Sequence, residues 1–169
     1  FACNLLLVND GLGNFIIHED LDFNLQQAYG NPMSSLVVDL NNDDYDDLVF
    51  WNFDNRPNTI PEEGFALVSN GTANVDNWTL IELPEGPFGR NHNKFNHAAW
   101  GDLNNDGNND VVVGITRDLP YYEGAYVQIL MGDGNGNLTD VTDTNFNTQP
   151  RQANHHGESN IYLRDFDDD

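Results

Sequence analysis

The sequence predicts an all-β protein built from repeated units of about 63 residues, each a series of strands joined by turns. An acidic loop rich in Asp and Asn occurs three times, beginning at Asp39, Asp102 and Asp165. Short apolar segments follow the first two loops and alternate with Gly-rich turns, as half-buried strands do. No segment has the period of an amphipathic helix. Self-similarity at a fixed spacing is the signature of a repeat architecture.

Composition narrows the class of protein. The 169 residues are enough for one domain, but 28 acidic residues face only six Lys and Arg, for a formal charge of -22. Such a chain cannot neutralise phosphates, so we expect no nucleic-acid partner. Ten Phe, six Tyr and three Trp argue against disorder. Cys3 is the only cysteine, which excludes an intramolecular disulfide, and the longest apolar run, residues 5–8, is too short for membrane insertion.

The strands of each unit are placed by the loops and by hairpin turns. Residues 48–51 and 111–115 follow the first two loops directly and are β-branched or aromatic, which predicts buried strands. Three turns at 10–14, 70–72 and 133–137 then mark hairpins. The strands expected on either side of these hairpins are 4–7 and 15–17, 65–68 and 78–81, and 127–130 and 138–141.

Aligning the units on the loop divides the chain into four parts. The expected parts are 1–30, the end of one unit; 31–95, a unit with loop 39–47; 96–158, a unit with loop 102–110; and 159–169, the start of another with a truncated loop. On this alignment the chain begins in mid-unit and stops in mid-loop. It is then either an excerpt of a longer protein or a chain completed by its neighbours.

The acidic loops have the ligand pattern of a calcium site. Oxygen-bearing side chains at positions 1, 3, 5 and 9, with a main-chain carbonyl at position 7, suit a hard cation. The candidate ligands are Asp39, Asn41, Asp43, Tyr45 and Asp47 in the first loop, Asp102, Asn104, Asp106, Asn108 and Asp110 in the second, and Asp165, Asp167 and Asp169 in the third. The alternative is a merely solvated acidic turn.

Two details qualify this site. An EF-hand is excluded because position 12 is not Glu and a strand, not a helix, follows each loop. Position 6 favours Gly and is Gly107 in the second loop but Asp44 in the first, so we expect the first site to be weaker.

We expect the Ca²⁺ to stabilise the loops rather than to take part in catalysis. Low-affinity calcium modules are typical of extracellular proteins.

Two segments resemble a known family. Residues 98–110 with the Val run that follows, and residues 131–142, are similar to the FG-GAP or VCBS-type repeat of integrin α-subunit heads and many secreted bacterial proteins. The resemblance covers nearly the whole chain. It implies a β-propeller of four-stranded blades with calcium in a loop between strands. The chain would hold roughly two and a half blades, an incomplete ring.

A second cluster of interest is histidine. His92 and His97 precede the second loop, and His155 and His156 precede the third. They could form a ligand pocket, a transition-metal site or an acid–base pair, or could simply be hydrogen-bonded in polar connections. Tyr29 takes the equivalent place in the first unit. No nucleophile motif is present, so no catalytic residue is assigned.

Asn70, Asn77 and Asn137 begin N-glycosylation sequons, all at hairpin turns where a glycan would be tolerated. Three sequons are close to what chance gives in so Asn-rich a chain. Glycans at these sites would indicate a secreted glycoprotein.

The expected function is extracellular adhesion or recognition of a protein or glycan, without catalysis. The variable connections 54–64, 84–97 and 117–125 would form the binding face. One alternative is a structural subunit of a self-assembling surface fibre or array, whose sheet edges pair with neighbouring blades or identical chains. Another is a blade segment of a calcium-dependent polysaccharide-acting enzyme.

Overall fold

The computed structural model describes residues 7–17, 32–52, 64–72, 77–89, 92–117, 123–145 and 160–164. Within these ranges the chain forms two four-stranded sheets, a two-stranded hairpin and one helical turn. Every strand pair is antiparallel. The expected all-β class is therefore confirmed. Predicted features at 1–6, 18–31, 53–63, 146–159 and 165–169, including Tyr29, His155, His156 and the third loop, lie outside the described residues.

Each four-stranded sheet is a meander in which strands adjacent in sequence are adjacent in space. The first sheet contains β3 (Pro32–Val38), β4 (Asp47–Asn52), β5 (Gly64–Val68) and β6 (Thr79–Glu82). The second contains β7 (Asn93–Gly101), β8 (Asp110–Arg117), β9 (Glu123–Gly132) and β10 (Leu138–Asp140). The hairpin is β1 (Leu7–Asn9) with β2 (Phe15–Ile17), and α2 (Thr142–Asn145) follows β10.

The strand pairing itself repeats. Equivalent pairs lie one repeat apart: Val38 with Asp47 and Gly101 with Asp110, and Leu48 with Leu67 and Val111 with Leu130. A register irregularity also recurs near the start of the first strand, between Pro32 and Ser34 in β3 and between Phe95 and Ala98 in β7. The unit boundary expected at 95/96 falls inside β7.

The two sheets pack face to face over one buried cluster. The first sheet contributes Val49 and Trp51 from β4, and the second contributes Val111, Val113 and Ile115 from β8. The Trp51 ring, 1% exposed, lies in this cluster, 6.2 Å from the ring of Phe95 in β7. Burial of these side chains is the main apolar contribution that joins the sheets.

The strands carry apolar side chains on both faces, one of which lies against the other sheet. Phe50, on the opposite face of β4 from Trp51, packs on Phe65 at 5.1 Å. In β8 the other set of positions faces the neighbouring sheet. Val113, one repeat after Phe50, faces the first sheet, and buried Val112, one repeat after Val49, faces away from it. The two sheets therefore stack in the same orientation, one face of the first against the opposite face of the second.

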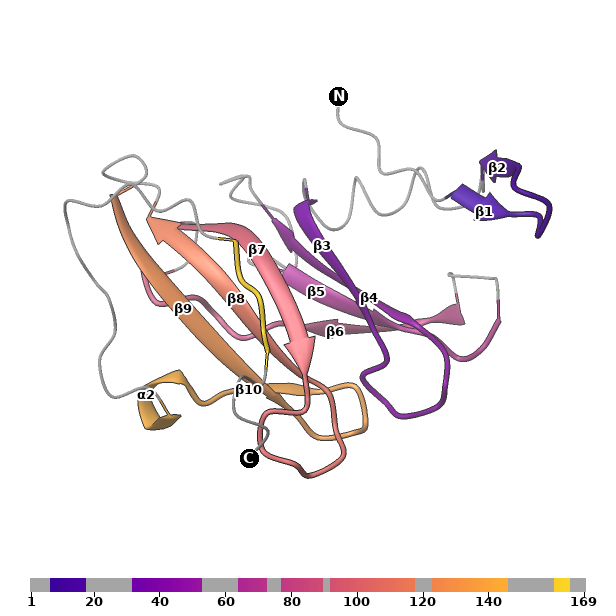
Figure 1. Ribbon diagram of the computed structural model, residues 1–169. Helices are drawn as coiled ribbons and strands as arrows, with labels where there is room; N and C mark the ends of the chain where they lie inside the picture. The colour runs from indigo at the N-terminus through magenta and orange to yellow at the C-terminus, as the bar shows by residue number, and fades with distance from the viewer. Residues whose placement is uncertain are drawn as a thin grey trace.

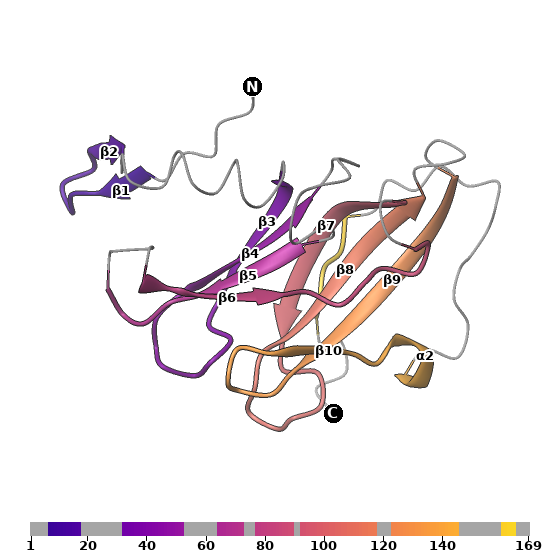
Figure 2. The same ribbon diagram turned by 180° about the vertical axis from the view of Figure 1, so that it is seen from behind.

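The arrangement brings three turns to one end of the stack. The β3–β4 and β7–β8 loops and the β9–β10 hairpin lie together below the sheets in Figure 1, and the view from behind in Figure 2 shows the same grouping. The β1–β2 hairpin lies to one side of the sheets in both views. Two of the three turns at this end are the acidic loops.

Replacement of Trp51 by Ala should cost about 3–5 kcal/mol of unfolding free energy, because it empties the centre of the interface between the sheets. Trp100→Ala is the matched control. Trp100 is 48% exposed, so its loss should cost much less. Chemical denaturation followed by circular dichroism measures both, and equal losses would contradict the described interface.

Candidate metal-binding loops

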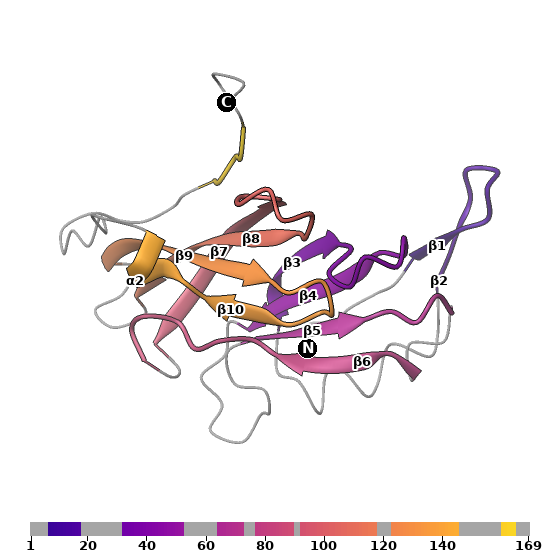
Figure 3. The same cartoon turned by 90° about the horizontal axis from the view of Figure 1, so that it is seen from below.

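The two acidic loops described by the structure are residues 39–47, here called the first loop, and residues 102–110, the second loop. Each joins the first and second strands of its sheet, and its last residue opens the second strand. Seen from below, the two loops and the β9–β10 hairpin are neighbours (Figure 3). The candidate ligands of both loops thus gather at one end of the stack.

The position 1 aspartate closes each loop. Its two carboxylate oxygens accept hydrogen bonds from the main-chain N–H groups of positions 5 and 6. In the first loop Asp39 accepts from Asp43 at 3.3 Å and from Asp44 at 3.0 Å; in the second Asp102 accepts from Asp106 at 3.1 Å and from Gly107 at 2.9 Å. The pattern is that of an extended Asx turn, and it recurs at the same place in both units.

Positions 3 and 5 place more oxygens at the same point. The Asn41 Oδ1 accepts from the Asp43 N–H at 3.3 Å, so this N–H lies between Asn41 Oδ1 and Asp39 Oδ1. In the second loop the Asp106 N–H lies between the corresponding oxygens, at 3.0 Å from Asn104 and 3.1 Å from Asp102. Side-chain oxygens of positions 1 and 3 therefore converge in both loops.

The asparagine amide offsets the negative charge of the loop. Asn41 Nδ2 donates to Asp43 Oδ2 at 2.9 Å, and Asn104 Nδ2 donates to Asp106 Oδ2 at the same distance. Flipping either amide would turn its oxygen toward the carboxylate, which is favourable only if a cation lies between them. This all-oxygen donor set fits a hard cation such as Ca²⁺ and offers nothing to a soft metal.

The main chain of position 7 lies beside these carboxylates. The N–H of Tyr45 donates to Asp43 Oδ1 at 2.9 Å, and the N–H of Asn108 donates to Asp106 Oδ1 at 2.8 Å. The Tyr45 side chain is half exposed and its ring lies over Gly71. The position 7 carbonyl, which the sequence predicted as a ligand, stays a prediction.

The position 9 aspartate has a second task. Asp47, with no exposed surface, accepts from the N–H of Leu40 at 2.8 Å and of Ser69 at 2.7 Å. Asp110 is equally buried and accepts from the N–H groups of Leu103 at 2.8 Å and Gly132 at 2.9 Å. Both carboxylates thus join their loop to the end of the third strand of the sheet.

Burial and hydrogen bonding act in opposite directions on Asp47. Burial raises the pKa of its carboxyl group, and the N–H groups of Leu40 and Ser69 oppose this by favouring the charged form. The nearby carboxylates of Asp43 and Asp39 raise the pKa further. In the second loop the N–H of Asn108 and the amide of Asn104 lower the pKa of exposed Asp106.

Backbone conformation separates the two loops at position 6. Asn42 and Asn105, both at position 4, have φ of 58°, in the left-handed region that Asn tolerates. At position 6 Asp44 has φ of 66° and Gly107 has φ of 87°. Both loops need a left-handed residue there, and only the second uses glycine for it.

No cluster of three or more His, Cys, Asp or Glu side chains that could hold a metal ion occurs among the described residues. Each loop brings together the aspartates of positions 1 and 5, the asparagine of position 3 and main-chain groups, while the position 9 aspartate holds main-chain N–H groups. The donor set of the described loops thus depends on amide and carbonyl oxygens as much as on carboxylates. The third loop, with Asp165, Asp167 and Asp169, is outside the described ranges.

The described histidines are not brought together. His92 and His97 are exposed, on the segment before β7 and on β7 itself. The His97 Nδ1 accepts from the Ile161 N–H at 3.4 Å, and its ring lies 6.2 Å from that of Tyr162. His155 and His156 fall outside the described residues, so the expected histidine cluster stays a prediction.

The three sequon asparagines are exposed and lie at turns, as expected. Asn70 Oδ1 accepts from the Thr72 hydroxyl at 2.6 Å, and Asn70 Nδ2 donates to the carbonyl of Asn77 at 3.3 Å. Asn137 Nδ2 donates to Asp133 Oδ2 at 2.8 Å. Two of the sequon amides therefore hold their own hairpins together.

Sequence reasoning missed two kinds of residue, those that cap hairpins and those that join the two units. Asp10 and Asp133 cap their hairpins identically, each accepting from the amide of an asparagine four residues later at 2.8 Å, which lowers the pKa of both. The repeated Asp-Gly-x-Gly-Asn pattern was the available signal. Asn42 and Asn109 make contacts between units, and Asn109 has no counterpart in the first loop, where position 8 is Asp46.

Comparison with known proteins adds no family: no family model, curated protein or solved structure matches the chain. In the described part of the chain no helix has the length and apolar character needed to cross a membrane.

In calcium-free solution Asp47 should titrate above the ordinary aspartate value of 3.8 and Asp106 below it. Side-chain carboxyl ¹³C shifts measured by NMR between pH 2 and 7 report both. By linkage, Asp47 contributes stability at low pH, and this contribution is lost as the pH rises from 3.8 through its raised folded pKa. Asp106 contributes stability above pH 3.8, and this contribution is lost as the pH falls through its lowered folded pKa. The reverse order of midpoints would contradict the burial of Asp47.

Proposed function

We propose that the chain is a segment of a calcium-stabilised β-propeller of the FG-GAP or VCBS type, used outside the cell to recognise a protein or glycan, without catalysis. One observation carries the proposal. Two loops, one repeat apart in the sequence, have the same oxygen-rich geometry at the same place in two stacked four-stranded sheets. Each sheet would be a blade of the propeller.

Charge supports calcium as the ligand. The chain carries a formal charge of -22, and each described loop concentrates several carboxylates in a short segment. Bound Ca²⁺ would relieve their mutual repulsion and take the place of the N–H and amide donors that otherwise offset it. Asp39, Asn41 and Asp43, and Asp102, Asn104 and Asp106, would hold the ion, with the carbonyls of Tyr45 and Asn108 and one oxygen each of Asp47 and Asp110.

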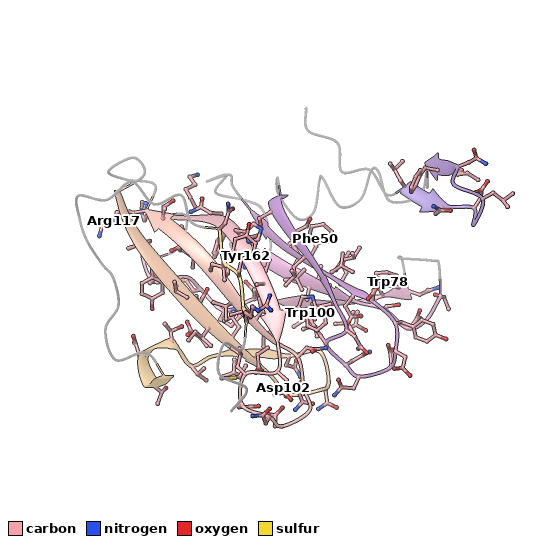
Figure 4. The ribbon with its side chains drawn as sticks, in the orientation of Figure 1. Phe50, Trp78, Trp100, Asp102, Arg117 and Tyr162 are labelled. Atoms are coloured by element: carbon pink, nitrogen blue, oxygen red, sulfur yellow. The ribbon has the colours of Figure 1, made fainter. Side chains whose placement is uncertain are left out.

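The recognition surface of this proposal would lie at the end away from the loops. β4 and β8 run from the loops to that end, so the connections after them begin there. Arg117, at the end of β8, lies far from Asp102 in Figure 4. Its guanidinium is 5.1 Å from the centre of the Phe88 ring, which packs edge-on to Tyr126 at 6.0 Å. Tyr126 is 4% exposed and lies beneath this surface, whereas Phe88 and Arg117 are partly exposed and belong to residue types enriched in binding surfaces.

Calcium should raise the melting temperature of the chain, and Asp106→Ala should remove part of that gain. At a calcium concentration about ten times the Kd, each site contributes about 1.4 kcal/mol of stabilisation. Thermal melts in millimolar calcium and in excess chelator measure the difference, with Asn135→Ala, outside both loops, as control. Equal melting temperatures with and without calcium in the parent chain would refute the proposal.

Asp44→Gly should tighten the first site about two- to fivefold, because glycine adopts the left-handed conformation of position 6 without the cost of a side chain. The matched exchange Gly107→Asp in the second loop should weaken its site by a similar factor. Calorimetric titration with calcium compares the two, and a weaker first site in Asp44→Gly would show that the carboxylate is itself a ligand.

A further inference from the structure

The first loop makes three hydrogen bonds to the second unit. Its main-chain carbonyls at positions 1 and 2 accept from that unit, and its position 4 side chain donates to it. The bonds are Asn109 Nδ2 to Asp39 O at 2.6 Å, Gly136 N to Leu40 O at 3.1 Å, and Asn42 Nδ2 to Asn108 Oδ1 at 2.8 Å. These contacts join residues far apart in the sequence, so they exist only when the sheets are stacked.

Burial shows how far the second unit covers the first loop. Leu40, at position 2 of the first loop, is 1% exposed, whereas Leu103, at the same position of the second loop, is 40% exposed. Among the described residues nothing covers the second loop as the second unit covers the first. Two loops of the same local geometry therefore differ in their surroundings.

The β9–β10 hairpin approaches the first unit too closely for larger residues. A Cβ at Gly136 would lie 2.9 Å from Val68 Cγ2 and 3.2 Å from Ile81 Cδ1. A Cβ at Gly134 would meet the Asn42 and Asn108 side chains, which bond to each other. Both glycines also have positive φ, 69° at Gly134 and 93° at Gly136. Both the positive φ and the close approach of the hairpin to the first unit therefore require glycine at these two positions.

We propose that the second unit supports the cation site of the first loop, so that the calcium affinity of each loop depends on its contacts with the other through Asn109 and the Asn42–Asn108 pair. The inference rests on the proposed function. Asp39 supplies the position 1 ligand, and the bond from Asn109 to its carbonyl fixes the main chain that carries the carboxylate.

The same contacts act in the other direction. Asn109 lies between the position 7 carbonyl of Asn108 and the position 9 carboxylate of Asp110, so anchoring its side chain on Asp39 orders that part of the second loop. Coupling between binding sites is reciprocal: if filling the first loop favours the second, the reverse holds by the same factor. The stacked sheets, held by the apolar cluster around Trp51, keep the partners in place.

The test isolates the first loop by disabling the second with Asp106→Ala in the full chain. Calcium affinity is then measured by titration calorimetry in that background alone and with Asn109→Ala added. Truncating Asn109 should weaken the remaining first-loop site about fivefold, at the low end of couplings between sites. The matched control is Asn135→Ala, whose amide bonds only to Asp133 in its own hairpin and which should leave the affinity within twofold.

A reciprocal variant guards against a folding defect in Asn109→Ala. Asn42→Gly removes the amide that bonds Asn108 but suits the φ of 58° at this position, so the loop keeps its conformation. With the first loop disabled by Asp43→Ala, Asn42→Gly should weaken the second-loop site by a similar factor.

Unchanged affinity in both variants, with calcium still binding, would overturn the coupling and leave the proposed function standing. No calcium binding by the parent chain would overturn both.

Discussion

A buried carboxylate at the start of the second strand of each sheet is the contact on which the loop geometry depends. Asp47 and Asp110 each accept one N–H from their own loop and one from the end of the third strand. Without the carboxylate both N–H groups would be left unpaired in the interior, at roughly 1–3 kcal/mol each. The carboxylates at positions 1 and 5 are likewise bonded to main-chain N–H groups, which bring positive partial charge into an acidic loop. The backbone therefore holds the carboxylates of each loop in place.

Two effects oppose each other in the comparison of the loops. The second loop has glycine at position 6, where a left-handed residue is needed, and the first has Asp44. The first loop in turn is covered and bonded by the next unit, while Leu103 in the second is exposed. Local strain favours the second loop and tertiary support favours the first.

The sequence alone determined the length of the repeat, the all-β class, the position of the loops and the oxygen-rich character of their side chains. These properties are local: alternation of apolar residues, turn residues with positive φ, and short-range Asx bonds each act within about ten residues. The capping role of Asp10 and Asp133 could have been predicted for the same reason, because the Asp-Gly-x-Gly-Asn pattern is local. The two asparagines at position 4 were visible as a repeat, but their contacts were not.

The tertiary structure alone decided which face of each strand meets the other sheet, the inward use of Asp47 and Asp110, and the bonds of Asn109 and Gly136 to the first loop. Val49 and Val112 occupy equivalent positions, yet only Val49 faces the other described sheet, because the two sheets stack with equivalent faces pointing the same way. Such outcomes depend on contacts between residues far apart in the chain. No local pattern encodes them, since they arise only when one buried face closes on another.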